Sequence, residues 1–256
     1  MNLVVLGGTK GMGRALARLC AEHGDRVFLL GRDEADLSRS AGDLDLRAAL
    51  GASTDATAAA GFARCDLEQP ASFAPALDAA QQHFAGQRID AIVVTAGLFA
   101  TQDALEADAA LTERLLRVNF AHTVLFCEEA RKRLLAQGGG TLCVFSSVAG
   151  DRARKPVVLY GASKAGLSAY LDGIDHKFHS QGLRVICVRP GFVKTGMTAG
   201  LKPPPFSGEP QQVARDVRRA LCGHDPRTVV YTPWIWQLVM GTIATLPRAV
   251  MRRINF

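Results

Sequence analysis

The sequence predicts one α/β domain, residues 1–256, built on a parallel, doubly wound sheet of about seven strands with helices on both faces. Short apolar or β-branched runs alternate with segments of helical length, and this alternation is typical of a parallel sheet with right-handed crossovers. The runs are almost continuously apolar, as strands covered on both faces require. No internal repeat or interdomain linker divides the chain, whose 256 residues suit a single domain of this class.

Seven runs are expected to form the strands. In chain order they are NLVVLG (2–7), RVFLLG (26–31), GFARCD (61–66), DAIVVTAG (90–97), GTLCVFSS (140–147), LRVICVRP (183–190) and TVVYT (228–232). The segments between them, such as GRALARLCAEHG, carry the helical repeat of apolar residues and end at glycine. Residues 38–60 are alanine-rich and weakly patterned, so we expect a helix followed by a loose surface connection. The proline-rich segment LKPPPFSGEP (201–210) follows a strand end, where α/β sheets bind ligands, which favours a mobile lid over a plain surface loop.

Cysteine usage and charge narrow the function classes. The six cysteines are scattered without a CxxC pair or a zinc-finger histidine spacing, so neither a metal site nor a disulfide framework is expected. The net charge of +6 favours an anionic ligand or surface. The stretch RKR (131–133) lacks interleaved aromatic residues and is interpreted as a solvated helix end, so no nucleic-acid partner is expected. The chain opens on a buried strand in place of a secretory signal, which indicates a cytoplasmic protein.

A glycine-rich turn, LGGTKGMGR, ends the first strand and opens a helix. Gly7, Gly11 and Gly13 in the spacing GxxxGxG allow a sharp turn and let backbone amides approach a pyrophosphate. The helix N-terminus adds unpaired N–H donors and the positive end of the helix dipole. A tight turn without a ligand is the alternative reading. We expect a dinucleotide here, with Thr9 and Met12 also among its contacts.

The end of the second strand indicates which dinucleotide is bound. A carboxylate there would bind the adenosine ribose of NAD and repel the extra phosphate of NADP, but the chain has Arg32 first and delays the acid to Asp33. Lys10, in the glycine turn, can converge on the same point. Two cations favour NADPH, with NADH still possible, because a ribose phosphate accepts charge-assisted hydrogen bonds. The alternative is that Arg32 forms a solvated ion pair with Asp33 or Glu34.

Two further turns are expected to contact this dinucleotide. Asp66 and Leu67 end the third strand and suit the edge and face of an adenine. Ala96 and Gly97 form a small-residue turn after the fourth strand, beneath the cofactor.

A tyrosine and a lysine stand four residues apart in VVLYGASKAG. On a helix, Tyr160 and Lys164 share one face and reach one cleft. A phenol titrates near ~10, and an adjacent ammonium is expected to lower that pKa by stabilising the phenolate, which would make it a proton donor at neutral pH. Ser147, at the end of the fifth strand, can bond and polarise a carbonyl oxygen. In isolation the same spacing would indicate a core aromatic and an unrelated surface lysine.

With these motifs the chain resembles the short-chain dehydrogenase/reductase family over nearly its whole length. The resemblance rests on the glycine turn, the RVNF segment, the serine of SSVAG, the YGASK helix and RPGFVKT (189–195). It implies a Rossmann-type fold and reduction of a ketone with Tyr160 as general acid. Lys164 would then lower the tyrosine pKa and hold the nicotinamide ribose, Ser147 would stabilise the developing alkoxide, and Asn119 would support a water relay.

The same resemblance extends to the segment after the sixth strand. Past Pro190 and Gly191, the backbone of Val193 and the side chain of Thr195 would hold the nicotinamide carboxamide. The family's usual Asn-Asn-Ala-Gly segment is replaced here by Val-Thr-Ala-Gly (94–97), which removes an asparagine contact near the cofactor.

The C-terminal tail, residues 234–256, combines an apolar run with arginines. The run from Trp234 to Leu246 is about thirteen residues, shorter than the roughly 20 needed to cross a bilayer. Tryptophans at one end and arginines at the other suit a segment lying on the inner face of a membrane. Burial against another subunit of a homodimer or homotetramer is an equal alternative.

A narrower resemblance bears on the substrate. GDRARKPVVLYGASKAGL, VRPGFVKTGMTAGLK and LPRAVMRR look like segments of the reductases that act on decaprenylphosphoryl 2-keto-ribose. That similarity implies a lipid-linked keto-sugar substrate and a partner flavoenzyme that makes the ketone. A carbonyl or 3-oxoacyl reductase with a soluble substrate and an oligomerising tail is one alternative, and a non-catalytic nucleotide-sensing scaffold is another.

Overall fold

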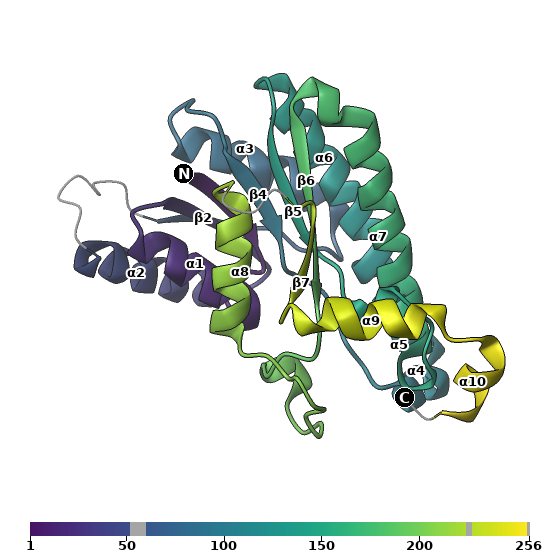
Figure 1. Cartoon of the computed structure of the whole chain (residues 1–256). Helices are drawn as coiled ribbons and strands as arrows, with labels where there is room; N and C mark the ends of the chain where they lie inside the picture. The colour runs from purple at the N-terminus through teal and green to yellow at the C-terminus, as the bar shows by residue number, and fades with distance from the viewer. Residues whose placement is uncertain (52–59, 224–226, 255–256) are drawn as a thin grey trace.

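The computed structural model describes residues 1–51, 60–223 and 227–254. Within them, seven parallel strands form one sheet in the order β3-β2-β1-β4-β5-β6-β7 (Figure 1). The strands are β1 (Asn2–Leu6), β2 (Arg26–Gly31), β3 (Gly61–Arg64), β4 (Ala91–Val94), β5 (Gly140–Phe145), β6 (Leu183–Pro190) and β7 (Val229–Thr232). All seven expected strands are confirmed, most of them ending one to three residues earlier than their apolar runs because the chain turns away from the sheet there.

The strand order reverses beside β1. The chain runs outward from β1 to β2 and β3 and then returns to place β4 on the other side of β1, where Leu6 pairs with Leu30 of β2 and Val94 of β4. The loops after β1 and β4 therefore diverge at the carboxyl ends of these strands, and such a switch point is where doubly wound sheets bind ligands.

Helices cover both faces of the sheet (Figure 1). They are α1 (Gly11–Glu22), α2 (Glu34–Leu50), α3 (Phe73–His83), α4 (Gln102–Ala107), α5 (Ala109–Leu116), α6 (Thr123–Ala136), α7 (Val158–Phe178), α8 (Pro210–Leu221), α9 (Ile235–Thr245) and α10 (Arg248–Arg253). Short helical turns are η1 (Pro70–Ser72), η2 (Arg117–His122, a π-helix), η3 (Val148–Gly150), η4 (Lys155–Val157), η5 (His179–Gln181) and η6 (Gly196–Thr198). The helix expected near residue 38 is α2, and residues 52–59 of the connection expected after it lie outside the described residues.

The two halves of the core follow from the alternation of side chains along β1. Val4 and Leu6 join the cluster beneath α3, α6 and α7, whereas Leu3 and Val5 join the cluster beneath α1, α2 and α8. Successive residues of a strand point to opposite faces, so a strand buried on both sides needs an apolar residue at every position. This requirement explains the uninterrupted apolar runs of the sequence.

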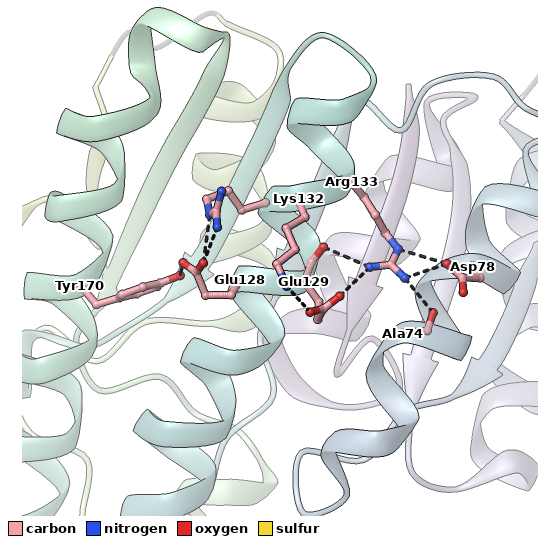
Figure 2. A network of polar contacts seen from close by, with 8 residues as sticks. Ala74, Asp78, Glu128, Glu129, Lys132, Arg133 and Tyr170 are labelled. Carbon is pink, nitrogen blue, oxygen red and sulfur yellow. Dashed lines mark hydrogen bonds and ion pairs between the residues drawn. The ribbon is translucent and has the colours of Figure 1, made fainter.

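The two arginines of the RKR segment differ from its interpretation as a solvated helix end, whereas Lys132 between them is 60% exposed. Arg133 donates to Asp78 at 2.7 Å and to Glu129 at 3.0 Å, which ties α6 to α3 (Figure 2). Arg131 pairs with Glu128, which also accepts from Tyr170 of α7 at 2.7 Å. Both arginine side chains are only 16% exposed, because the helix end is packed between its neighbours. These two arginines therefore take part in polar contacts that connect α6 to α3 and to α7.

The tail folds back onto its own domain. Trp236 and Met240 of α9 are buried against Val148 of η3, and Figure 1 shows α9 running from the end of β7 towards α4 and α5. Arg152 and Lys155 donate to backbone carbonyls of the tail, at Leu246 (2.8 Å) and Arg252 (2.9 Å). No helix in the described part of the chain is long and apolar enough to cross a membrane.

Candidate active site

Two adjoining cavities lie at the carboxyl ends of the strands. The first, of about 320 Å³, is lined by the turns that follow β1, β2, β3 and β4. The second, of about 760 Å³, is lined by the segments after β5 and β6 and by the start of α7. Met12, Thr195 and Met197 line both cavities, so the two meet at these residues.

The glycine turn forms one wall of the first cavity. Gly7 has a φ of +92°, and a Cβ on it would lie 2.7 Å from the backbone nitrogen of Ala96. A Cβ on Gly13 would lie 2.3 Å from the carbonyl oxygen of Gly7. The turn is therefore packed too closely for any other residue at these two positions. Helix α1 starts at Gly11 with no side-chain cap and no acid in its first turn, and this leaves its N-terminal donors facing a cavity that Gly7, Thr9, Gly11, Met12 and Gly13 line.

Lys10 and Arg32 both line the first cavity, as the sequence predicts. Asp33 does not compete for a ligand, because its carboxylate caps α2 by accepting from the amide of Asp36 at 2.8 Å. Among the described residues, no ion pair joins Arg32 to Asp33 or Glu34. Lys10 instead pairs with Asp36 at 2.9 Å, and the Lys10 hydrogen bond lowers the pKa of that carboxyl.

The far end of the first cavity contains the other predicted contacts. Asp66 and Leu67 line it, and the Asp66 carboxylate accepts from the amide of Glu68 at 3.0 Å, which holds the turn after β3. Ala96 and Gly97 line it from the end of β4. The structure therefore brings these four residues together with the glycine turn.

Thr95 and Asn119 hold the β4 turn in place. The Thr95 hydroxyl lies 3.1 Å from both the Leu6 and Gly7 carbonyl oxygens, so the residue that replaces the family's asparagine ties β4 to the glycine turn. The amide of Asn119 donates to the Leu98 carbonyl at 2.8 Å and accepts from the Leu98 N–H at 2.7 Å. Asn119 is fully buried, and its position in the π-helical turn directs it to this backbone.

Ser147 and Tyr160 line the second cavity together. Ser147 follows β5, caps η3 by accepting from the Ala149 amide at 3.1 Å, and lies 3.4 Å from the carbonyl oxygen of Pro190. Tyr160 is in the first turn of α7, and its ring packs edge-on against Phe99 at 5.2 Å between centroids. Burial raises the pKa of the Tyr160 phenol, and the neighbouring Ser147 hydroxyl lowers that pKa by less. Two hydroxyls thus meet in one cavity beside the glycine turn.

Lys164 lies one helical turn beyond Tyr160 and is 5% exposed. Its Nζ donates to the carbonyl of Phe145 at 3.0 Å and lies 5.9 Å from the centre of the Tyr160 ring. A Cβ on Gly97 would come within 3.7 Å of this Nζ and 3.2 Å of Asn119 Oδ1. Lys164 and Asn119 therefore meet at the β4 turn, behind the cavity that holds Tyr160.

The expected fall in the tyrosine pKa is not what the structure shows. Burial raises the pKa of Tyr160 to about 12 and lowers the pKa of Lys164 to about 8. The reason is that Lys164 donates to a backbone carbonyl, not to the phenol, so desolvation dominates both groups.

The segment after β6 completes the second cavity. Pro190, Gly191, Val193 and Thr195 all line it, as predicted. A Cβ on Gly191 would lie 2.0 Å from the indole nitrogen of Trp236, so only glycine fits beneath that ring.

Sequence reasoning missed part of this wall. Phe99, Arg154 and Trp236 line the second cavity beside the predicted residues. The composition of the tail predicts that its tryptophans lie at a lipid interface. The contact between Trp236 and Gly191 joins segments 45 positions apart, so no local sequence pattern predicts it. Arg154 stands six residues before Tyr160, and only the turn η4 between them brings it to the same cavity.

Comparison with known proteins agrees with this arrangement. The family model described as short chain dehydrogenase matches residues 2–205. An uncharacterized oxidoreductase of Mycobacterium tuberculosis is 31% identical, with 98% of this chain and 96% of that protein covered. Carbonyl reductase family member 4 of Danio rerio is 30% identical, with 83% and 87% covered. A solved short chain dehydrogenase of Burkholderia cenocepacia in complex with NADP has a TM-score of 0.80 at 21% identity, with 99% and 97% covered.

Proposed function

The chain belongs to the short-chain dehydrogenase/reductase family of NAD(P)-dependent oxidoreductases, and we propose that it reduces a ketone to a secondary alcohol, with NADPH preferred over NADH. The observation that carries this proposal is the meeting of the Ser147 and Tyr160 hydroxyls in a cavity that borders the glycine turn. The Tyr160 phenol is the proton donor, and Ser147 binds the carbonyl oxygen.

The residues of the first cavity fit a dinucleotide. The space that a Cβ would fill at Gly7 and Gly13 is occupied by backbone, so the turn presents N–H groups without side chains in the way. When bound, the reduced nicotinamide supplies a hydride to the carbonyl carbon. Thr195 and Met12 line both cavities and would orient the ring between the two sites.

The protein's own part in the reaction is to hold the carbonyl and deliver a proton. The Ser147 hydroxyl donates to the carbonyl oxygen and stabilises the negative charge that grows there. The phenolic proton of Tyr160 then moves to that oxygen, which leaves an alcohol and a phenolate. A pKa of about 12 keeps the phenol protonated before the reaction, and an alkoxide is basic enough to take its proton. Lys164 and Asn119, which meet at the β4 turn, would return a proton to the phenolate through water.

The NADPH preference rests on Arg32 and Lys10. Both cations line the first cavity, while Asp33, the acid that would repel a ribose phosphate, is turned into a helix cap. A phosphate there would accept from Arg32 and share Lys10 with Asp36. The related structure from Burkholderia cenocepacia that contains NADP is in keeping with this preference.

Two substrate classes remain as proposals. A lipid-linked keto-sugar agrees with the narrower resemblance and with two exposed apolar residues, Phe206 (57% exposed) and Trp234 (64% exposed). Each stands two positions in the chain from a residue that lines the cavity. These residues and the arginines of the tail would rest on the inner face of the membrane. A soluble carbonyl substrate is supported by the similarity to a carbonyl reductase.

For either substrate class we propose a homodimer or homotetramer, since Phe120 and Leu125 are exposed on the η2–α6 surface.

The proposed function is tested by ketone-dependent oxidation of NADPH by the full chain, with a panel of aliphatic and sugar ketones. Turnover of at least one ketone, faster with NADPH than with NADH, is the expected result. Binding of NADPH without turnover of any ketone would contradict it.

A further inference from the structure

The wall of the second cavity carries more positive than negative charge. Arg154, Lys155 and Lys202 line it, and Asp103 is the one carboxylate among its described lining residues. The two lysines come from separate segments, η4 and the loop after η6, and both line this one cavity.

Arg154 is half-buried in this wall. Burial lowers the pKa of its guanidinium, and the charge of Asp151 acts in the opposite direction. Asp151 is itself fixed, because it accepts from Arg189 at 3.1 Å. Burying an arginine costs free energy because its charge is desolvated. A position in a cavity wall is therefore favourable when a ligand or a fixed carboxylate compensates the charge.

Lys155 and Lys202 differ from Arg154 in being exposed. Lys155 donates to the carbonyl of Arg252 at 2.9 Å, which fixes it between η4 and the tail helix α10. The cavity therefore has a half-buried guanidinium in its wall and two exposed ammonium groups at its rim. A guanidinium binds carboxylate and phosphate oxygens in a fixed fork, and the ammonium groups add charge.

The remaining wall is mostly apolar. Its apolar lining residues include Phe99, Val148, Phe192, Leu201 and Trp236. A ligand that fills this space needs an apolar or extended body, with its ketone at the hydroxyls and its charge at the rim.

We propose that the substrate is a ketone that carries an anionic group, a carboxylate or a phosphate, and that Arg154 binds this group with Lys155 and Lys202 at the cavity rim. This inference rests on the proposed ketone reductase function and adds the chemical class of its substrate. Arg154 is then a specificity-determining residue, since it touches the substrate away from the reacting carbon.

The test compares three probes of equal chain length, an aliphatic keto acid, its methyl ester and the corresponding keto-alkyl phosphate. Each is assayed with NADPH for the full-length parent, Arg154→Met and Arg154→Lys, and Arg219→Met is the control, because Arg219 is exposed on α8 and does not line the cavity. The parent should prefer an anionic probe over the ester. Arg154→Met should lower kcat/KM for that probe by roughly 10- to 100-fold, the worth of a charge-assisted hydrogen bond, and leave the ester unchanged. Arg154→Lys should recover part of the loss.

The two anionic probes separate the possible sources. If Arg154→Met lowers kcat/KM more for the keto-alkyl phosphate than for the keto acid, the substrate carries a phosphate. If it lowers kcat/KM more for the keto acid, the substrate carries a carboxylate. Equal kcat/KM for the ester and both anions in the parent, or an equal effect of Arg154→Met and Arg219→Met, would overturn the inference.

A binding measurement keeps this test separate from the proposed function. Trp236 lines the cavity, so its fluorescence can report each probe in the Trp234→Phe variant, which leaves it as the single tryptophan of the chain. If no ketone is turned over, the proposed function fails. The inference still stands if the anionic probes bind at least tenfold tighter than the ester and lose that advantage in Arg154→Met, and it fails if they do not.

Discussion

The Nζ of Lys164 lies 5.9 Å from the centre of the Tyr160 ring and gives its hydrogen bond to the carbonyl of Phe145. The two groups are thus neighbours in one buried site without being bonded to each other. Each is shifted by burial towards its neutral form, Lys164 to a pKa of about 8 and Tyr160 to about 12. An anion placed next to Lys164, such as a phenolate formed during the reaction, would raise the pKa of Lys164 back towards its usual value.

The low pKa of Lys164 predicts how stability depends on pH. Between about pH 8 and pH 10.5 the unfolded lysine binds more proton than the folded one, so the contribution of Lys164 to the free energy of unfolding rises with pH in this window. Lys164→Met removes the group and its pH dependence. Urea unfolding of both proteins from pH 7.5 to pH 10, where Tyr160 stays protonated when folded, should show the stability advantage of the methionine variant shrinking as pH rises. Across the window, the difference in the free energy of unfolding between the two proteins should change by about 1.4 kcal/mol for each unit by which the folded and unfolded pKa values of Lys164 differ. An advantage that is constant over this range would contradict the burial argument.

Arg32→Ala should weaken NADPH more than NADH. Loss of a charge-assisted hydrogen bond to the ribose phosphate predicts roughly a 10- to 100-fold rise in the Kd for NADPH, with the Kd for NADH nearly unchanged. Nucleotide fluorescence titration measures both constants. Arg39→Ala is the matched control, because Arg39 pairs with Asp36 on the same helix but does not line the cavity. A ratio of the two constants that is unchanged in Arg32→Ala would overturn the NADPH preference.

Gly191→Ala should disturb the tail helix. The new Cβ would meet the indole nitrogen of Trp236 at 2.0 Å, and that indole is held by its hydrogen bond to the Phe206 carbonyl at 3.1 Å. We expect a loss of roughly 1–3 kcal/mol in the free energy of unfolding, since overpacking displaces a buried ring. Gly241→Ala, on α9 with open space around it, should cost nothing.

A double-mutant cycle identifies the cause of that loss. In a Trp236→Leu background the alanine at position 191 should cost less than in the parent, because the clashing ring is gone. Equal costs in the two backgrounds would exclude Trp236 as the reason for the glycine.

The exposed face of the tail decides between lipid and subunit contact. Trp234 and Leu238 are 64% and 58% exposed on the side away from the core. If they contact lipid, replacing both with serine should reduce co-sedimentation with vesicles that contain phosphatidylglycerol, while the molar mass in solution stays constant. If they contact a subunit, the molar mass measured by light scattering should fall and vesicle binding should not change.

Much of the fold follows from local pattern. Apolar residues at every position of β1 predict a strand buried on both faces, and the glycine spacing predicts a turn that Gly7 and Gly13 prove too tight for any side chain. The i, i+4 spacing of Tyr160 and Lys164 likewise predicts that they are neighbours. Helical geometry and sterics decide these features within a few residues.

Other features depend on contacts between distant segments. The direction of the Tyr160 pKa shift depends on which acceptor Lys164 reaches, and that acceptor, Phe145, belongs to another element. The local sequence predicts that Arg133 is a solvated cation, because its partner Asp78 belongs to another helix, α3. Trp236 enters the cavity wall because α9 folds back past β7, which no spacing in the tail predicts.

The central claim is that the Tyr160 phenol supplies the proton for reduction of a ketone by NADPH. The most direct measurement is the rate of ketone-dependent NADPH oxidation by Tyr160→Phe, with NADPH binding measured in parallel by fluorescence. Removal of one hydroxyl should lower kcat by roughly 10²- to 10⁴-fold, the worth of a general acid, with the Kd for NADPH unchanged. A kcat within about twofold of the parent value would contradict the account, because the proton would then come from another group.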